Sequence, residues 1–427
     1  TSSTVTLELT AEEIETLGQA NDEMIRGIEL FEEGEDDITQ AMVDTSISSA
    51  ALPYNSTRGN SVGIYMTESG CANENRITNY DRLSGSETNH SRNVGAILRA
   101  VSPSSFIYCR GGNVLPTFWD LIGPLFTFGL RPPIEIVTMS ASKNDSTSYS
   151  TVDRDWDNFV YSNNIPVFNS GGNTGNGTGN VCSPGKGLNV ITVGNYDDAN
   201  DTIRSDSPFV DPQTGNQKPE IVAPGTNITA GGFTMSGTSQ STPHAAAFAA
   251  DMMSDSTYLK GKPYLLKAKV LASATDPISG GSNKVGLGGI DFATGQWSGY
   301  YQWYEGENND FEYFDQADGT NDNYVSKKIY IGSYWDRVQV VLSWLTRGTY
   351  TYDHRNDAHP IGMDLDLRVY DPYGQYMGGS HSWDNPYEDV AFTPTVSGYY
   401  TFKIKRYANR DKANNLRMGL YVNYYFN

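Results

Sequence analysis

Residues 237–244 read Gly237-Thr238-Ser239-Gln240-Ser241-Thr242-Pro243-His244, and the alanine-rich run 245–250 follows. Small residues around Ser239, with a proline one turn later, predict a loop that delivers this serine to the first turn of a buried helix. Unpaired N–H groups at a helix start stabilise negative charge, so a hydroxyl placed there can attack a carbonyl group. The competing interpretation is an alanine-rich core helix with a serine or threonine cap.

Two residues that could assist such a serine come earlier in the chain. The run 61–67 is short and apolar and stops at Glu68, which predicts a buried strand that carries this carboxylate to the carboxyl-terminal edge of a sheet. His90 stands at the start of segment 89–100, whose apolar residues share one face of a predicted helix. The plainer alternatives are a strand-end glutamate that faces water and a histidine that caps a helix.

A glycine-rich turn at 171–175 contains Asn173 and follows the strand-like run 165–170. An amide there can donate to an oxyanion, although an asparagine that only shapes the turn gives the same pattern. The octapeptide around Ser239 resembles the Gly-Thr-Ser-x-x-x-Pro-His element of the subtilisin-like serine peptidases, with every fixed position present. The carboxylate, histidine, asparagine and serine motifs also occur in that family's chain order. The resemblance covers roughly residues 42–298.

The resemblance implies a role for each of these residues. Ser239 is the nucleophile, His90 the general base, and Glu68 the triad acid in place of the family's usual aspartate. The histidine motif, His-Ser-Arg-Asn-Val, matches the family's His-Gly-Thr in part. Asn173 and the backbone N–H of Ser239 form the oxyanion hole. The implied fold is a parallel-sheet, three-layer α/β catalytic domain, which the alternating strand-like and helical segments also favour.

The same resemblance implies a substrate-binding surface. Its residues are Ser140, Ala141, Ser142, Gly171, Gly172 and Cys182. The segment 140–142 pairs with the main chain of an extended peptide. Cys182 falls near the floor of the pocket for the residue before the scissile bond. A free thiol is expected there, which leaves Cys71 and Cys109 as the only possible bridge among the 3 Cys.

Composition narrows the possible partners. Thirty Lys+Arg against 50 Asp+Glu give a net charge of −20, which argues against nucleic acid or an anionic membrane as a partner. No apolar run of about 18 residues indicates a membrane span. Abundant Tyr, Gly, Asn, Ser and Thr suggest a secreted, extracellular protein, which we expect to be a monomer.

Two segments flank the expected catalytic domain. Residues 1–41 predict an acidic helical extension, either a propeptide remnant or an arm that wraps the core. From 299 to 427 the chain is rich in aromatic and acidic residues, and the runs 338–344, 364–370 and 398–404 alternate with period two. This pattern predicts an antiparallel β-sandwich, and it resembles the jelly-roll domains that follow the catalytic domain in some subtilisin-like enzymes.

Acidic side chains in this C-terminal segment could bind a structural calcium ion. The candidate ligands are Asp315, Asp318, Asp322, Asp364 and Asp366, because oxygen ligands with a nearby glycine turn suit calcium. A solvated acidic loop explains the same residues. No cofactor is implied for catalysis.

The leading hypothesis is therefore a secreted serine endopeptidase that acts on polypeptide substrates. One alternative is an inactive homologue that serves as a binding or scaffolding protein. The other is an adhesive or carbohydrate-binding protein that acts through its C-terminal domain.

Overall fold

The computed structural model describes residues 58–426 except 128–130, 144–147, 293–300 and 318–322. The expected helical extension at 1–41 lies outside this range. All described residues belong to one compact unit, and within it the two largest hydrophobic cores are formed mainly by residues on either side of position 299. Among the residues described, no helix has the length and hydropathy to cross a bilayer.

The first half is built on an eight-stranded sheet with the order β2-β3-β1-β4-β5-β6-β7 and with β8 paired to β6. The strands are β1 (Gly63–Glu68), β2 (Tyr80–Ser84), β3 (Phe106–Gly111), β4 (Ile134–Met139), β5 (Val167–Ser170), β6 (Ile191–Asp197), β7 (Thr202–Ile203) and β8 (Ile221–Pro224). Every pairing is parallel except that of β6 with β7. The predicted parallel sheet is confirmed.

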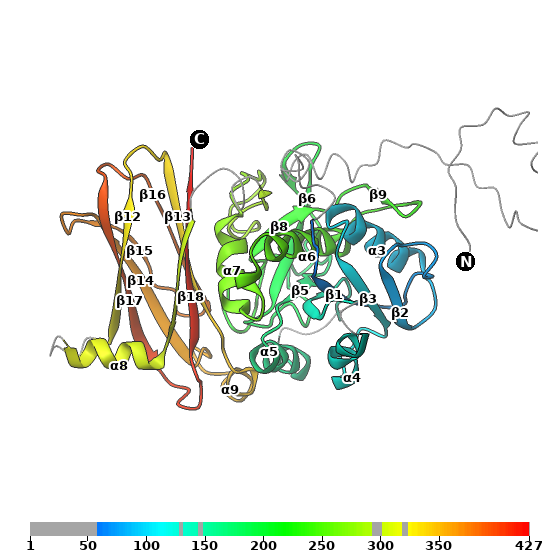
Figure 1. Ribbon diagram of the computed structural model, residues 1–427, viewed down its shortest axis with the longest axis horizontal. Helices are drawn as coiled ribbons and strands as arrows, with labels where there is room; N and C mark the ends of the chain where they lie inside the picture. Colours follow the sequence, from blue (N-terminus) through cyan, green and yellow to red (C-terminus); the bar gives the residue numbers. More distant parts are fainter. Residues whose placement is uncertain (1–57, 128–130, 144–147, 293–300, 318–322, 427) are drawn as a thin grey trace, which may run out of the picture. The chain divides into compact units, whose positions relative to one another are not determined.

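Helices cover both faces of this sheet (Figure 1). They are α3 (Asn89–Val101), α6 (Thr238–Asp255) and α7 (Pro263–Ala272) on one face, and α5 (Thr151–Asn163) on the other. Successive residues of the fully buried β1 supply the two faces, since Ile64 and Met66 join the core of α3 and α6, whereas Tyr65 joins that of α5. Shorter segments are α4 (Phe118–Ile122), η2 (Gly123–Thr127), η3 (Thr257–Leu259) and the hairpin of β9 (Ile228–Ala230) with β10 (Phe233–Met235).

Alanines explain the central position of α6. The five alanines at 245–247 and 249–250 are fully buried, and their small side chains let the helix backbone approach the sheet closely. The predicted serine-bearing helix, with Ser239 in its first turn, is present.

The second half contains two antiparallel four-stranded sheets. One is β11 (Tyr301–Glu307), β18 (Arg417–Tyr425), β13 (Arg337–Trp344) and β16 (Tyr387–Phe392); the other is β12 (Tyr324–Ile331), β17 (Gly398–Asn409), β14 (Met363–Tyr370) and β15 (Tyr376–Ser380). The helices α8 (Asn308–Ala317) and α9 (Gly348–Asp353) lie in the connections. The three predicted strands appear in β13, β14 and β17, whereas the jelly-roll connectivity stays a prediction.

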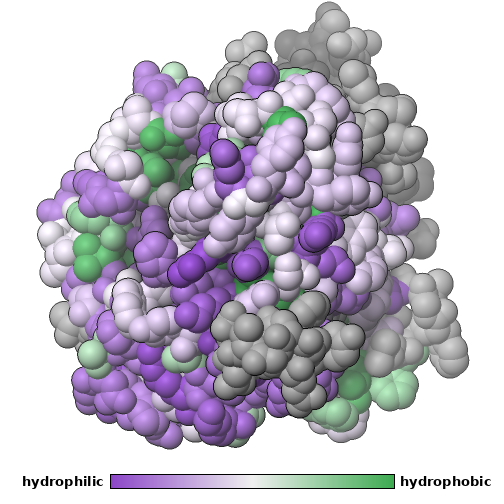
Figure 2. Space-filling view, turned by 90° about the vertical axis from the view of Figure 1, so that its left-hand side faces the viewer, coloured by the Kyte–Doolittle hydropathy of each residue, from purple (hydrophilic) through white to green (hydrophobic). Residues whose placement is uncertain are grey.

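The two halves share buried contacts. Val341, Tyr387 and Tyr421 of the second half belong to the core that contains Leu265 and Leu266 of α7. Asn189 Nδ2 also donates to the Thr346 carbonyl oxygen at 2.8 Å. The face shown in Figure 2 is mostly hydrophilic, with hydrophobic residues in small separate groups, as expected for a chain with a net charge of −20.

A buried ionic cluster lies near this junction. Glu220 Oε1 accepts from Lys218 Nζ at 2.7 Å and from Lys267 Nζ at 3.0 Å, and the side chains of all three residues are at most 2% exposed. Glu220 Oε2 accepts from the Thr192 N–H at 2.8 Å. Burial lowers the pKa of Lys267, while the charge of Glu220 opposes that shift. The carboxylate of Glu220 thus supplies the negative charge that both buried ammonium groups contact.

Glu220→Gln should therefore lower the free energy of unfolding by about 3 kcal/mol or more, because two buried ammonium groups lose their counter-charge. Urea denaturation followed by circular dichroism measures the change. The matched control is Glu307→Gln at an exposed position, which should stay within about 0.5 kcal/mol of the parent. A loss below about 1 kcal/mol for Glu220→Gln would show that the cluster is not a stabilising element.

Candidate active site

Glu68 lies at the carboxyl-terminal end of β1, in the centre of the parallel sheet, and is fully buried. Its two carboxylate oxygens have different partners. Oε1 accepts from the Ser140 N–H at 3.0 Å, just beyond the end of β4, and Oε2 lies 3.0 Å from His90 Nδ1. Asp81 of β2, another acidic residue of this sheet, pairs with Arg131. The structure therefore brings Glu68 and His90 together.

His90 is held at the start of α3 by the residues that flank it. Thr88 caps the helix by accepting from the Ser91 N–H at 3.0 Å, and Ser91 Oγ accepts in return from the Thr88 N–H at 3.1 Å. The serine after the histidine is thus a capping residue. The hydrogen bond to Glu68 raises the pKa of His90 above its ordinary value, burial opposes this shift, and the charge of Glu68 adds to it.

Asn93 has a positioning role that the sequence analysis missed. This fully buried side chain donates through Nδ2 to the carbonyl oxygen of Phe233 at 2.8 Å and that of Ala230 at 3.1 Å. Its Oδ1 accepts from Gln240 Nε2 at 3.1 Å. It therefore ties the His90 helix to the residue after Ser239. A polar residue among the apolar positions of segment 89–100 was the available signal.

Ser239 is the second residue of α6, and its Oγ donates to the Ser140 carbonyl oxygen at 2.9 Å rather than to the His90 ring. Ser140 therefore contacts Glu68 through its N–H and Ser239 through its carbonyl. A hydrogen bond from the serine to the histidine would have to replace the present one. Catalytic hydrogen bonds are often unformed in the absence of substrate.

Asn173 adjoins the start of the same helix. Its Oδ1 accepts from the Thr238 N–H at 3.1 Å, which leaves the amide nitrogen as the donor beside the first turn of α6. Gly237 has φ +151°, and a Cβ there would lie 3.1 Å from Asn173 Nδ2. The glycine therefore permits the close approach between the amide and the helix start.

The residues predicted to bind substrate adjoin this group. Ala141 and Ser142 line a pocket of about 400 Å³, together with Met139, Trp156 and Ser183. Cys182 is buried against Gly172, and its N–H donates to the Gly171 carbonyl at 2.8 Å. It is not disulfide-bonded, whereas Cys71 and Cys109 form a bridge, which is the pairing that the sequence allows.

Of the candidate calcium ligands, the structure describes the side chains of Asp364 and Asp366, which line one pocket in the C-terminal half. Asp364 pairs with Arg410 at 3.4 Å, and no group of three His, Cys, Asp or Glu residues in the described ranges is arranged to hold a metal. Asp318 and Asp322, and the side chain of Asp315, lie outside the described residues. Calcium binding therefore stays a prediction.

Part of the chain is similar to known proteins. Residues 122–296 match the model of the subtilase family, so this segment is subtilase-like and the predicted relation to the serine-type, subtilisin-like peptidases is confirmed. Serine protease AprX of Bacillus subtilis (strain 168) is 35% identical over 152 residues, which are 28% of this chain and 33% of that protein. The match thus spans about a third of the length of this curated relative.

Two solved structures are also similar. The prenylagaramide maturation protease PagA has a TM-score of 0.45 and 22% identity, over 56% of this chain and 94% of its own. A cold adapted subtilisin-like serine proteinase has a TM-score of 0.42 and 20% identity, over 55% of this chain and 88% of its own.

The contact between Glu68 and His90 predicts the titration of the imidazole. Because the carboxylate favours the charged ring, His90 should titrate above 6.5, and Glu68→Gln should lower that midpoint. NMR of the full chain with labelled histidine rings measures both values. His244 is the internal control, since burial lowers its pKa to about 3 and it should stay neutral across the range. An equal His90 midpoint in the parent and in Glu68→Gln would contradict the pairing.

Proposed function

We propose that this chain is a secreted serine endopeptidase with Ser239 as nucleophile, His90 as general base and Glu68 as the acid that orients it. The observation that carries the proposal is the contact of Glu68 with His90, joined through Ser140 to Ser239 at a helix start. The Cys71–Cys109 bridge supports secretion, because disulfides persist mainly in oxidising compartments.

The reaction follows from these positions. Ser239 Oγ attacks the peptide carbonyl carbon while His90 Nε2 takes its proton, and His90 Nδ1–H donates to Glu68. Asn173 Nδ2 and the Ser239 N–H stabilise the oxyanion of the tetrahedral intermediate. His90 then gives the proton to the leaving amine, which leaves an acyl-serine. A water, deprotonated by the same imidazole, attacks the acyl group and releases the second product.

A glutamate in the acid position is compatible with this scheme. The side chain is one methylene longer than aspartate, and the bond from the Ser140 N–H to Oε1 fixes the added length. The other oxygen is thereby directed at His90 Nδ1. The Glu68 side chain is therefore held in one orientation more firmly than a glutamate without this hydrogen bond would be.

Polypeptide substrates suit the neighbouring surface. Ser140 uses its main-chain groups for Glu68 and Ser239, and the Ala141 carbonyl accepts from Asn169 Nδ2. The other main-chain groups of 141–142 lie beyond the end of β4, where an extended peptide can pair without a requirement on its sequence. The adjoining pocket has an apolar wall of Met139, Val152 and Trp156, with Lys143 and Asp155 also lining it. We propose that the chain acts on polypeptides as a monomer.

The hydrogen bond from Ser239 to Ser140 would also suit an inactive homologue that only binds peptides. Mutation of Glu68 distinguishes peptide hydrolysis from peptide binding alone. Glu68→Gln should lower kcat for hydrolysis of a casein-derived peptide by about 10⁴-fold with little change in KM, because the imidazole loses its orienting charge. Glu68→Asp should lose less, since the charge remains and only the reach changes.

Ser239→Ala is the negative control in the same assay and should show no enzymatic turnover. Glu307→Gln, which changes an exposed glutamate, should cleave at the parent rate. If the parent chain cleaves no peptide, or if Ser239→Ala cleaves at the parent rate, the proposed function is wrong. If Ser239→Ala is inactive but Glu68→Gln keeps the parent kcat, the peptidase function stands and a residue other than Glu68 orients His90.

A further inference from the structure

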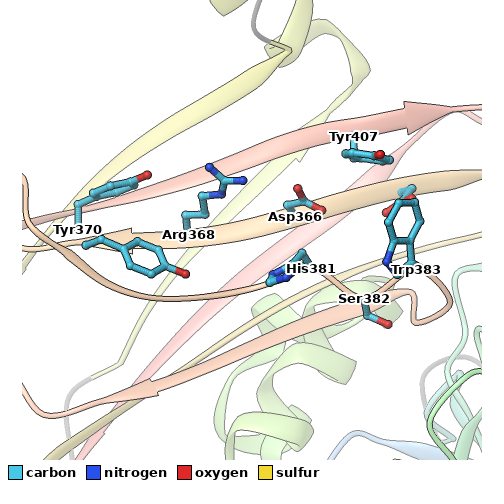
Figure 3. A pocket seen from close by; sticks show the side chains of 9 residues that line it. Asp366, Arg368, Tyr370, His381, Ser382, Trp383 and Tyr407 are labelled. Atoms are coloured by element: carbon cyan, nitrogen blue, oxygen red, sulfur yellow. The ribbon is translucent and has the colours of Figure 1, made fainter.

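The C-terminal half contains a pocket of about 450 Å³ that plays no part in the proposed peptidase chemistry. It lies between β14, β17 and the segment after β15, and its lining includes Asp366, Arg368, Trp383 and Tyr407. Pockets that bind small ligands fall in the range of about 300–1,000 Å³. Figure 3 shows Tyr370 at one end, Trp383 and Tyr407 at the other, and Arg368 and Asp366 between them.

The alternation of β14 explains why polar side chains gather here. Leu365, Leu367 and Val369 belong to the hydrophobic core between the two sheets. The residues between them, Asp364 and Asp366 among others, therefore project from the opposite face of the strand. Uncharged polar residues would be enough to keep this face soluble, so charged groups placed between exposed aromatic rings call for a separate explanation.

Asp366 lies near the cationic groups of Arg368 and Lys405 without bonding directly to either. Its residue is only 6% exposed, yet no described residue makes a hydrogen bond or an ion pair with its carboxylate. Asp364, two positions earlier, pairs with Arg410. The Asp366 carboxylate oxygens stay accessible from the pocket, so a ligand hydroxyl group can reach them and donate a hydrogen bond.

Aromatic rings are exposed at both ends of the pocket. Trp383 is 46% and Tyr407 48% exposed, with their ring centroids 5.2 Å apart. At the other end, Tyr376 is 58% exposed and packs edge-on against Tyr370 at 5.7 Å. The negative face of such rings attracts the C–H groups of a flat, partly apolar ligand.

Charge selects among ligand classes. Arg368 and His381 line the pocket, and Lys405 is the cross-strand partner of Asp366, so a cationic ligand would meet positive charge as well as the carboxylate. An anionic ligand would meet Asp364 and Asp366. A neutral polyol both donates and accepts hydrogen bonds, so it can satisfy the carboxylate and the guanidinium at once.

We propose that this pocket binds a neutral oligosaccharide, with a sugar ring against Trp383 and Tyr407 and hydroxyl groups bonded to Asp366 and Arg368. Asp366 and Tyr370 lie four positions apart on β14, which is about 13 Å along the strand. The pocket is therefore long enough for more than one sugar ring. The binding site is distinct from the cleft beside Ser239, so it would attach the chain to a glycan rather than take part in hydrolysis.

The test is isothermal titration of the full chain with cellotetraose, maltotetraose, tetra-N-acetylchitotetraose and mannotetraose. At least one of them should bind with a stoichiometry near one. Asp366→Asn and Tyr407→Ala should each weaken that binding by about tenfold or more, through the lost hydrogen bond and the lost ring contact. Tyr399→Ala, which removes an exposed tyrosine outside the pocket, should leave the affinity unchanged.

Thermal melts of each variant separate loss of binding from loss of folding. Tyr407 is half exposed, so its variant keeps the test valid even if Asp366→Asn unfolds. Binding of none of the four sugars, or affinity unchanged in both pocket variants, overturns the proposal. Tetralysine or tetragalacturonate that binds in place of the neutral sugars also overturns it. Peptide hydrolysis by Tyr407→Ala should equal that of the parent, so this result is independent of the proposed peptidase function.

Discussion

The site depends on one buried carboxylate that is shared between a backbone amide and an imidazole. Glu68 Oε1 accepts from the Ser140 N–H, and Oε2 contacts His90 Nδ1. The main chain of Glu68 is fixed as well, because its carbonyl accepts from the Gly112 N–H at 2.7 Å. The carboxylate therefore has little freedom of position, and it aligns the end of β4 and the start of α3 around one point.

The arrangement of strands and helices explains the position of the Glu68 carboxylate. The carboxyl ends of parallel strands meet at one edge of a sheet, so β1 and β4 deliver Glu68 and Ser140 side by side. Two helices then begin at this edge, one with His90 and the other with Ser239 in its first turn. The pocket in the C-terminal half is built differently, from residues of the antiparallel strands β14, β15 and β17 and of the segment after β15. A change at the proposed glycan site therefore need not alter the proposed catalytic site.

Local sequence patterns were enough to predict the central features. The apolar run before Glu68, the helix after His90 and the alanines after Ser239 each indicated an element that the structure contains. The partners of Asn93 and Ser140 were not predictable, because each lies about 70 or more positions away in the sequence. The pocket around Asp366 was not predictable either, since the alternation of β14 shows which face Asp366 occupies but not which other segments line that face.

The most direct test of the account is labelling with a fluorophosphonate, a reagent that reacts with activated serines. The parent chain should be modified at Ser239, identified by mass spectrometry of the peptide that contains it. Heat-unfolded chain should not react, and the folded Glu68→Gln variant should react far more slowly, because its imidazole is poorly oriented. Equal labelling of parent and Glu68→Gln, or no labelling of Ser239 in the folded parent, would contradict the account.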